Sequence, residues 1–119
     1  QARRILRAAG VQGGLIVHLG GGDGTLTAAL RAGESYLVQG LDRSAAHVAA
    51  ARRHIQSLGL YGKVTAATFD GRHLPYADNL VNLLVASGEC QVAREEIARV
   101  LATGGVAGIS RFLRTEVLR

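Results

Sequence analysis

The feature that most constrains this chain is a run of glycines between a short apolar segment and a helix-like segment. The run lies in LIVHLGGGDGTLT, residues 15–27, and contains Gly20, Gly21, Gly22 and Gly24. Glycine adopts backbone angles that other residues avoid, and it places no side chain between a loop and its ligand. A strand, a glycine turn and a helix in this order are typical of α/β proteins that bind a nucleotide-like ligand at the carboxyl ends of their strands.

The details of this loop argue against a phosphate ligand. The dinucleotide fingerprint G-x-G-x-x-G/A fits Gly20 and Gly22, but its third place falls on Thr25, one residue after Gly24. Asp23 also lies in the loop, where its negative charge would face a pyrophosphate. A cationic ligand without phosphates fits better, and S-adenosylmethionine, with its sulfonium and α-amino group, is such a ligand. This disfavours a nicotinamide-dependent oxidoreductase, and a glycine turn that binds no ligand is the remaining alternative.

Length and composition are those of one domain, residues 1–119, with 48% hydrophobic residues for its core. Aromatic residues make up only 4%, so aliphatic residues and alanine must fill that core. No run approaches the roughly 20 apolar residues of a membrane span, and no signal-peptide pattern is present. We therefore expect a cytoplasmic protein. The chain begins with Gln1 rather than methionine, which is compatible with a segment of a longer chain.

Cysteine content and charge exclude several other functions. Cys90 is the single cysteine, so there is no internal disulfide and no cysteine-based zinc cage. We predict an inert thiol there and no metal site. The net charge is +5, but the arginines are scattered along the chain. A nucleic-acid-binding surface would need a basic stripe, preferably with aromatic residues for stacking. The sequence therefore carries no clear nucleic-acid signal.

Apolar segments with strand character alternate with segments of helical periodicity along the whole chain. The predicted helices span residues 2–9, 25–32, 45–57 and 92–101, and the predicted strands span 15–19, 36–41, 64–69, 80–85 and 106–110. Ser44 is the predicted N-cap of the third helix. This alternation indicates a parallel sheet covered on both faces. Right-handed crossovers then give a doubly wound, Rossmann-like α/β fold with strand order 3-2-1-4-5.

Two aspartates directly follow predicted strands. Asp42 ends the second strand, 18 residues after Gly24, where its carboxylate would accept hydrogen bonds from ribose hydroxyls. The alternative is an acid favoured by the dipole of the next helix. Asp70 ends the third strand and would accept from an adenine amino group, with Gly71 leaving room for the ring. An ordinary loop aspartate is an equally good interpretation of Asp70.

Four stretches in order resemble a class I S-adenosylmethionine-dependent methyltransferase over nearly the whole chain. They are VHLGGGDGTLT, VQGLDRSAAHVAAAR, ATFDGRHLPYADNLVNLLVAS and EEIARVLATGGVAGIS. In that family they are the glycine loop, the ribose acid, the adenine-side acid with its LP-aromatic turn, and the helix and glycine turn before strand five. The pattern is most similar to small-molecule methyltransferases of the quinone-biosynthesis type. It also resembles methyltransferase-like modules found beside quinone-binding β-propeller repeats.

The resemblance implies S-adenosyl-L-methionine as cofactor, S-adenosyl-L-homocysteine as product and a small-molecule acceptor. The glycines would lie along the methionine part of the cofactor, Asp42 would hold the ribose, and Arg43 would lie beside the adenine. The backbone near Ala86 and Ser87 would face the methionine amino group. The implied cofactor-binding residues are His18, Gly20, Gly21, Gly22, Gly24, Asp42, Arg43, Asp70, Gly71 and Ser87.

The chain also departs from the family pattern. His18 stands where the family usually has an acid that helps to hold the methionine ammonium. A neutral histidine would accept a hydrogen bond there, whereas a protonated one would repel the cation; a core histidine facing away from the loop is the alternative. Thr103 replaces a proline that is common before the glycine pair. The sequence ends soon after strand five, so strands six and seven of the family are missing. Because an unpaired sheet edge invites pairing, we expect a homodimer or a fused partner domain.

No catalytic residue is predicted. Methyl transfer from a sulfonium is an in-line displacement, so the protein mainly aligns the reactants and supplies electrostatic stabilisation. A base is needed only where the acceptor must lose a proton. His73 and Glu89 are the candidates for such a base, although both also fit ordinary surface residues. The interpretation is a methyltransferase core, and its rival is a non-catalytic cofactor-binding module of a larger protein.

Overall fold

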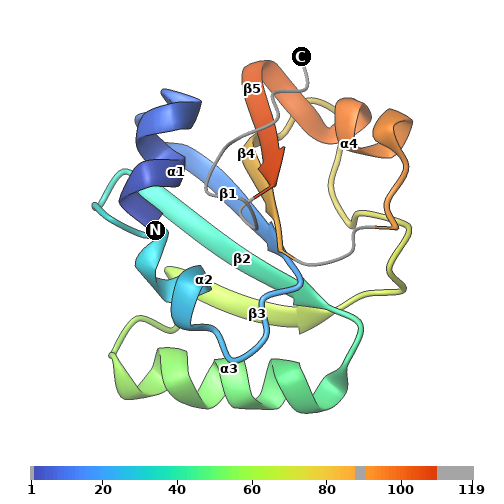
Figure 1. Ribbon diagram of the computed structural model, residues 1–119. Helices are drawn as coiled ribbons and strands as arrows, with labels where there is room; N and C mark the ends of the chain where they lie inside the picture. Colours follow the sequence, from blue (N-terminus) through green and yellow to red (C-terminus); the bar gives the residue numbers. More distant parts are fainter. Residues whose placement is uncertain (1, 88–90, 110–119) are drawn as a thin grey trace.

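Five strands form one sheet in the order β3-β2-β1-β4-β5, and every neighbouring pair is parallel (Figure 1). The structure is a computed structural model that describes residues 2–87 and 91–109. The strands are β1 (Gly14–Leu19), β2 (Tyr36–Asp42), β3 (Val64–Thr68), β4 (Val81–Ala86) and β5 (Leu101–Ile109). The predicted order and direction of the strands are therefore confirmed.

Helices lie on both faces of this sheet. They are α1 (Ala2–Ala9), α2 (Thr25–Ala29), α3 (Ala45–Ser57) and α4 (Arg94–Val100). Successive strand residues point to opposite faces. In β1, Ile16 joins a core cluster with residues of α1, α2 and α3, whereas Val17 joins a second cluster with Val100 of α4. Both faces are thus buried, as the apolar strand sequences predicted.

The carboxyl ends of β1, β2 and β4 meet at one edge of the sheet. Leu19 of β1 is paired with Leu41 of β2 and with Ala86 of β4. The residues that follow are joined as well, since Gly20 N–H donates to Leu41 O at 2.8 Å and Ser87 N–H donates to Leu19 O at 2.9 Å. This is the edge at which the glycine loop and the strand-end acid were predicted to meet.

The helix predictions hold for α1 and α3, whose bounds are those predicted. Ser44 caps α3 as predicted, because its hydroxyl accepts from His47 N–H at 3.2 Å. The prediction for residues 25–32 was too long, since α2 ends at Ala29. The fully buried Leu30 turns the chain there. Arg31 Nε then donates to Tyr36 O at 3.1 Å, which ties the turn to the start of β2.

The last helix and strand differ most from the prediction. The helix expected over 92–101 spans only Arg94–Val100, and Leu101 already belongs to β5. Leu101 pairs with Val81, but the next pairing is Val106 with Leu83, so the chain bulges between them. The glycine pair lies inside this bulge rather than before the strand. A Cβ on Gly105 would lie only 2.9 Å from Val81 O, which explains the small residue. The predicted last residue of this strand, Ser110, lies outside the described residues.

The connection between β3 and β4 is a loop, as its polar sequence predicted, and Arg99 of α4 holds it. Its guanidinium donates to Tyr76 O at 2.9 Å, Leu74 O at 3.1 Å and Asp78 Oδ1 at 2.8 Å. Glu96 accepts from Leu74 N–H at 2.8 Å. Hydrogen bonds from Arg99, and then from Leu74, lower the pKa of Glu96 to about 2. This clamp fixes the loop that starts at Asp70. None of the helices among the described residues is long and apolar enough to cross a membrane.

Candidate functional site

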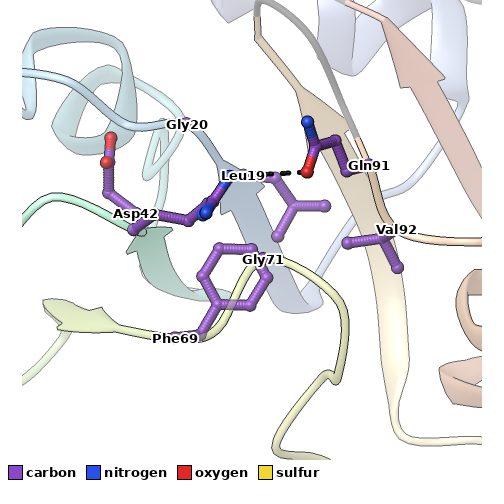
Figure 2. Close-up of a pocket in the computed structure, with 8 residues that line it drawn as sticks. Leu19, Gly20, Asp42, Phe69, Gly71, Gln91 and Val92 are labelled. Atoms are coloured by element: carbon purple, nitrogen blue, oxygen red, sulfur yellow. Dashed lines mark hydrogen bonds between the residues drawn. The ribbon is translucent and has the colours of Figure 1, made fainter.

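A pocket of about 220 Å³ lies at the carboxyl ends of the strands (Figure 2). Its apolar walls are Leu19 of β1, Phe69 after β3 and Val92 before α4, and Phe69 presents its ring to the cavity. Polar groups come from the end of β2 and from the segment after β4. The lining residues are Leu19, Gly20, Asp42, Arg43, Phe69, Gly71, Gln91 and Val92. A flat apolar slot beside a carboxylate is suited to a base with an attached sugar.

Asp42 stands where the sequence predicted it, at the tip of β2 beside the glycine loop. Its Oδ2 accepts from Gly22 N–H at 3.3 Å, and its Oδ1 accepts from Ser44 N–H at 2.9 Å. His47 Nδ1 lies 3.2 Å from both carboxylate oxygens. Burial opposes the charge, but the bonds from Ser44, Gly22 and His47 hold the pKa of Asp42 below its usual value. Asp42 is therefore an ionised acceptor, and sequence reasoning missed its partner His47.

Arg43, the residue after β2, also lines the pocket. Its Nη1 donates to Gln91 Oε1 at 3.4 Å, the interaction drawn as a dashed line in Figure 2. The stem of the side chain packs over Gly71, where a Cβ would lie 2.6 Å from Arg43 Cδ. The space that Gly71 leaves is thus occupied by Arg43. The predicted adenine contacts of both residues stay predictions, and the structure places both at the pocket.

The glycine loop is built around a close backbone approach. Gly20 has φ +75°, and a Cβ there would lie 2.5 Å from the carbonyl oxygen of Ser87. Gly24 has φ +85°, and its Cβ would lie 2.9 Å from Ala51 Cα on α3. These contacts require glycine at both positions, independently of any ligand. The structure thus places the backbone of Ser87 beside the glycine loop, and its contact with a methionine amino group stays a prediction.

His18 is buried beside the glycine loop, with 1% of its surface exposed. Nδ1 lies 2.7 Å from Thr27 Oγ1 on α2, and Nε2 lies 2.8 Å from Ser87 Oγ after β4. Burial lowers the pKa of His18 to about 4, against a smaller opposing effect of Asp42. The ring is therefore neutral near pH 7, and one nitrogen donates while the other accepts. Thr27, which the sequence analysis did not single out, is the buried partner that fixes the ring.

Asp70 is used within its own loop. Its Oδ1 accepts from Arg72 N–H and His73 N–H, both at 2.7 Å, and its Oδ2 lies 2.5 Å from His73 Nδ1. The bond to His73 is the main reason why the pKa of Asp70 is lowered, and it raises the pKa of His73 in turn. Asp70 does not line the pocket, and its adenine contact stays a prediction.

A second, more open hollow of about 500 Å³ adjoins the first at Gly20. It is lined by residues of the glycine loop together with His18 and Ser87. Asp23 lies at this hollow, where its Oδ1 accepts from Thr25 N–H at 3.0 Å.

The predicted site residues separate into two groups, one at the strand ends and one on an exposed loop. The strand ends bring together His18, the four glycines, Asp42, Arg43, Gly71 and Ser87, whereas Asp70 and His73 turn toward each other on an exposed loop. The candidate base Glu89 and the cysteine Cys90 lie outside the described residues. The sequence analysis missed four pocket residues, because nothing in the local sequence marks a residue as a pocket wall: Leu19, Phe69, Gln91 and Val92. In residues 2–87 and 91–109, no group of three or more His, Cys, Asp or Glu side chains is arranged to hold a metal.

Comparison with known sequences gives one family. The sequence model of the family described as "Methyltransferase domain" matches residues 16–105, which include most of β1 and the glycine loop at one end and all of α4 and the start of β5 at the other. No curated protein sequence matches the chain.

Solved structures with the same fold include enzymes of different activities. A protein assigned as an S-adenosyl-L-methionine-dependent methyltransferase from Methanococcus maripaludis is 26% identical with a TM-score of 0.83, over 95% of this chain and 57% of that one. A geranyl diphosphate C-methyltransferase from Streptomyces coelicolor, solved with Mg²⁺, geranyl diphosphate and S-adenosyl-L-homocysteine, is 20% identical with a TM-score of 0.82. That match covers 92% of this chain and 44% of the other. A 4+2 cyclase is 24% identical with a TM-score of 0.81, over 92% of this chain and 43% of that one. The chain thus spans less than two thirds of each of these structures.

The burial of His18 predicts a pH-dependent stability. The unfolded chain takes up a proton near pH 6.5, whereas the folded chain does so only near pH 4. The unfolded state therefore binds more protons in this interval, and the free energy of unfolding falls as the pH drops from about 6.5 to 4. The lost stability should reach at most about 3 kcal/mol. Urea unfolding measured at intervals of half a pH unit will show this slope.

The control is His18→Gln, which keeps polar groups near Thr27 and Ser87 but does not titrate. Subtracting its pH profile from that of the native chain removes the contributions of the carboxylates. Identical slopes for the native chain and His18→Gln would contradict the prediction.

Proposed function

Because the chain belongs to the methyltransferase domain family, we propose that it forms the cofactor-binding core of an S-adenosylmethionine-dependent methyltransferase. The methyl acceptor in this proposal is a small molecule, and the reaction takes place in the cytoplasm. The likeness to the quinone-biosynthesis type and to propeller-associated modules remains a prediction about that acceptor.

The observation that carries the proposal is the juxtaposition of an apolar slot with an ionised strand-end acid. A purine in the slot would meet apolar surface from Leu19, Phe69 and Val92. Asp42 is the last residue of β2 and would offer carboxylate oxygens to the two hydroxyls of a ribose. The ligand would then leave the slot past Gly20, which lines both this slot and the neighbouring hollow. These features fit an adenosine that carries a further chain on its ribose.

The residues of this chain would contribute positioning rather than covalent chemistry. When bound, S-adenosylmethionine supplies an electrophilic methyl group on a sulfonium. The slot would fix the adenosine, and Asp42 would fix the rotation of the ribose, so that the remainder of the ligand points along the glycine loop. Holding reactants in a productive orientation is a large part of catalysis for such displacements. No described residue need take part in bond making.

Two rivals differ in what the loop would have to bind or do. A nicotinamide dinucleotide would bring a pyrophosphate against Asp23, whose carboxylate is exposed at the loop. A non-catalytic module would bind the same cofactor without transferring its methyl group. The neutral and fully hydrogen-bonded His18 favours this second rival, because it offers no charge to a cationic ligand.

Ligand titration tests the proposal most directly. Calorimetry with S-adenosylhomocysteine, S-adenosylmethionine and NAD should show binding of the first two and at least tenfold weaker binding of NAD. The physical reason is repulsion between Asp23 and the pyrophosphate. Tighter binding of NAD would reject the proposal. Binding of S-adenosylmethionine without methyl transfer to any of a panel of small acceptors would favour the non-catalytic module.

Asp42→Ala tests the ribose contact. Loss of a hydrogen-bond acceptor that is charged should cost about 1.5–3 kcal/mol of affinity for S-adenosylhomocysteine. The fold should survive, since Asp42 lies at the tip of β2 and only its side chain is removed. The charge-matched control is Asp78→Ala, whose carboxylate bonds to Arg99 before the amino end of β4. Unchanged affinity in folded Asp42→Ala would assign the acid to the alternative role at the start of α3.

The outer strand β5 motivates a proposal about partners. It lies at the edge of the described sheet and pairs there with β4 alone. Unpaired backbone groups of an edge strand are a template for pairing with another chain. We therefore expect a homodimer, or stabilisation by a fused partner domain. Light scattering over a concentration series should show a mass above 12.5 kDa, and a monomer at millimolar concentration would count against the homodimer.

A further inference from the structure

The second hollow is the place where a ligand that fills the adenosine slot must continue. The two cavities share Gly20, and the slot is lined on its other sides by Phe69 and Val92. A chain attached to the ribose would pass Gly20 and enter the hollow between the glycine loop and Ser87. In the proposed cofactor this chain is an amino acid with an ammonium group. The charge of the hollow therefore determines how well the ammonium is held.

His18 does not supply the required charge. Its ring is neutral, and its two nitrogens are both used, at 2.7 Å from Thr27 Oγ1 and at 2.8 Å from Ser87 Oγ. An imidazole has only these two polar atoms. An ammonium that bound to His18 would have to break one of the two bonds in a ring that is almost fully buried.

Asp23 is the one acid among the described residues that line this hollow, and none of those residues is lysine or arginine. Thr25 N–H bonds to its Oδ1 at 3.0 Å, so the carboxylate is positioned before a ligand arrives. The same N–H, and next the hydroxyl of Thr25, lower the pKa of Asp23, with a smaller effect from His54. Asp23 is therefore ionised at neutral pH, and it is both exposed and among the residues that line the hollow.

From this arrangement we infer that Asp23 binds the ammonium group of the cofactor's methionine part and thereby selects ligands that carry an amino acid on the adenosine. The inference rests on the proposed cofactor. It gives Asp23 a direct role in binding, whereas the glycine-loop pattern alone indicates only that the charge of Asp23 disfavours a phosphate ligand. Positioning by Thr25 makes the carboxylate part of the loop rather than a freely moving surface charge.

The test compares two ligands that share the adenosine. S-adenosylhomocysteine carries the amino acid, whereas 5′-methylthioadenosine lacks it. Asp23→Asn keeps an acceptor for Thr25 N–H but removes the charge. It should weaken S-adenosylhomocysteine binding about 3- to 10-fold, as expected for a charge pair near the surface. Binding of 5′-methylthioadenosine should change less than twofold. The difference in S-adenosylhomocysteine affinity between the native chain and Asp23→Asn should be smaller in about 0.5 M salt than in about 0.05 M salt, because salt screens the charge pair.

The matched control is Glu34→Gln, which removes one negative charge just before the amino end of β2, at the opposite edge of the sheet. It should leave both affinities unchanged. Two results would overturn the role of Asp23 while leaving the proposed cofactor intact. In one, Asp23→Asn binds S-adenosylhomocysteine as tightly as the native chain does; in the other, it loses affinity for both ligands equally. A native chain that binds neither ligand would overturn the proposed cofactor and this inference together.

Discussion

The rest of this structure depends on one constraint, the close approach of three backbone segments of the chain at Gly20. Gly20 is joined to the end of β2 through Leu41 O, while the carbonyl of Ser87 comes so near that no side chain fits between them. Parallel pairing of β1 with both β2 and β4 brings these atoms together. Gly20 lines both cavities of the candidate site. Both the slot and the hollow beside it lie at strand ends whose pairing is in place before any ligand arrives.

Features encoded by local spacing could be predicted from the sequence. A strand followed by glycines, an acid at the next strand end and a Ser44 cap each depend on a few neighbouring residues, and the structure has all three. The pocket walls could not be predicted in this way, because Phe69 and Val92 are brought together only by the sheet order. The start of β5 was missed for a related reason. Its bulge is determined by pairing with Val81, and Leu101 also completes the helical pattern of the segment before it.

His18 illustrates how a polar group in a strand is made compatible with a buried position. Each of its two bonds contributes on the order of 1 kcal/mol, and leaving either nitrogen unpaired would cost about 1–3 kcal/mol. The ring therefore links β1 to Thr27 on α2 and to Ser87 after β4, next to the glycine loop. This stabilising role and a role in holding a cation compete for the same nitrogens. Sequence reasoning identified His18 as unusual, but Thr27 and Ser87 became its partners only through the fold.

The sheet alone does not determine the reaction, because function depends on the site that a fold carries. A 4+2 cyclase and a geranyl diphosphate C-methyltransferase share this architecture at TM-scores of 0.81 and 0.82. In this chain, parallel strand pairing brings backbone atoms together at the cleft that forms the candidate site. Differences must come from side chains around that cleft. In this chain those side chains are the bridge from Arg43 to Gln91 over the slot, and Asp23 at the hollow. Since neither contributes to the core, both positions are open to change without loss of the fold, and under the proposed function such changes would alter selectivity for the ligand.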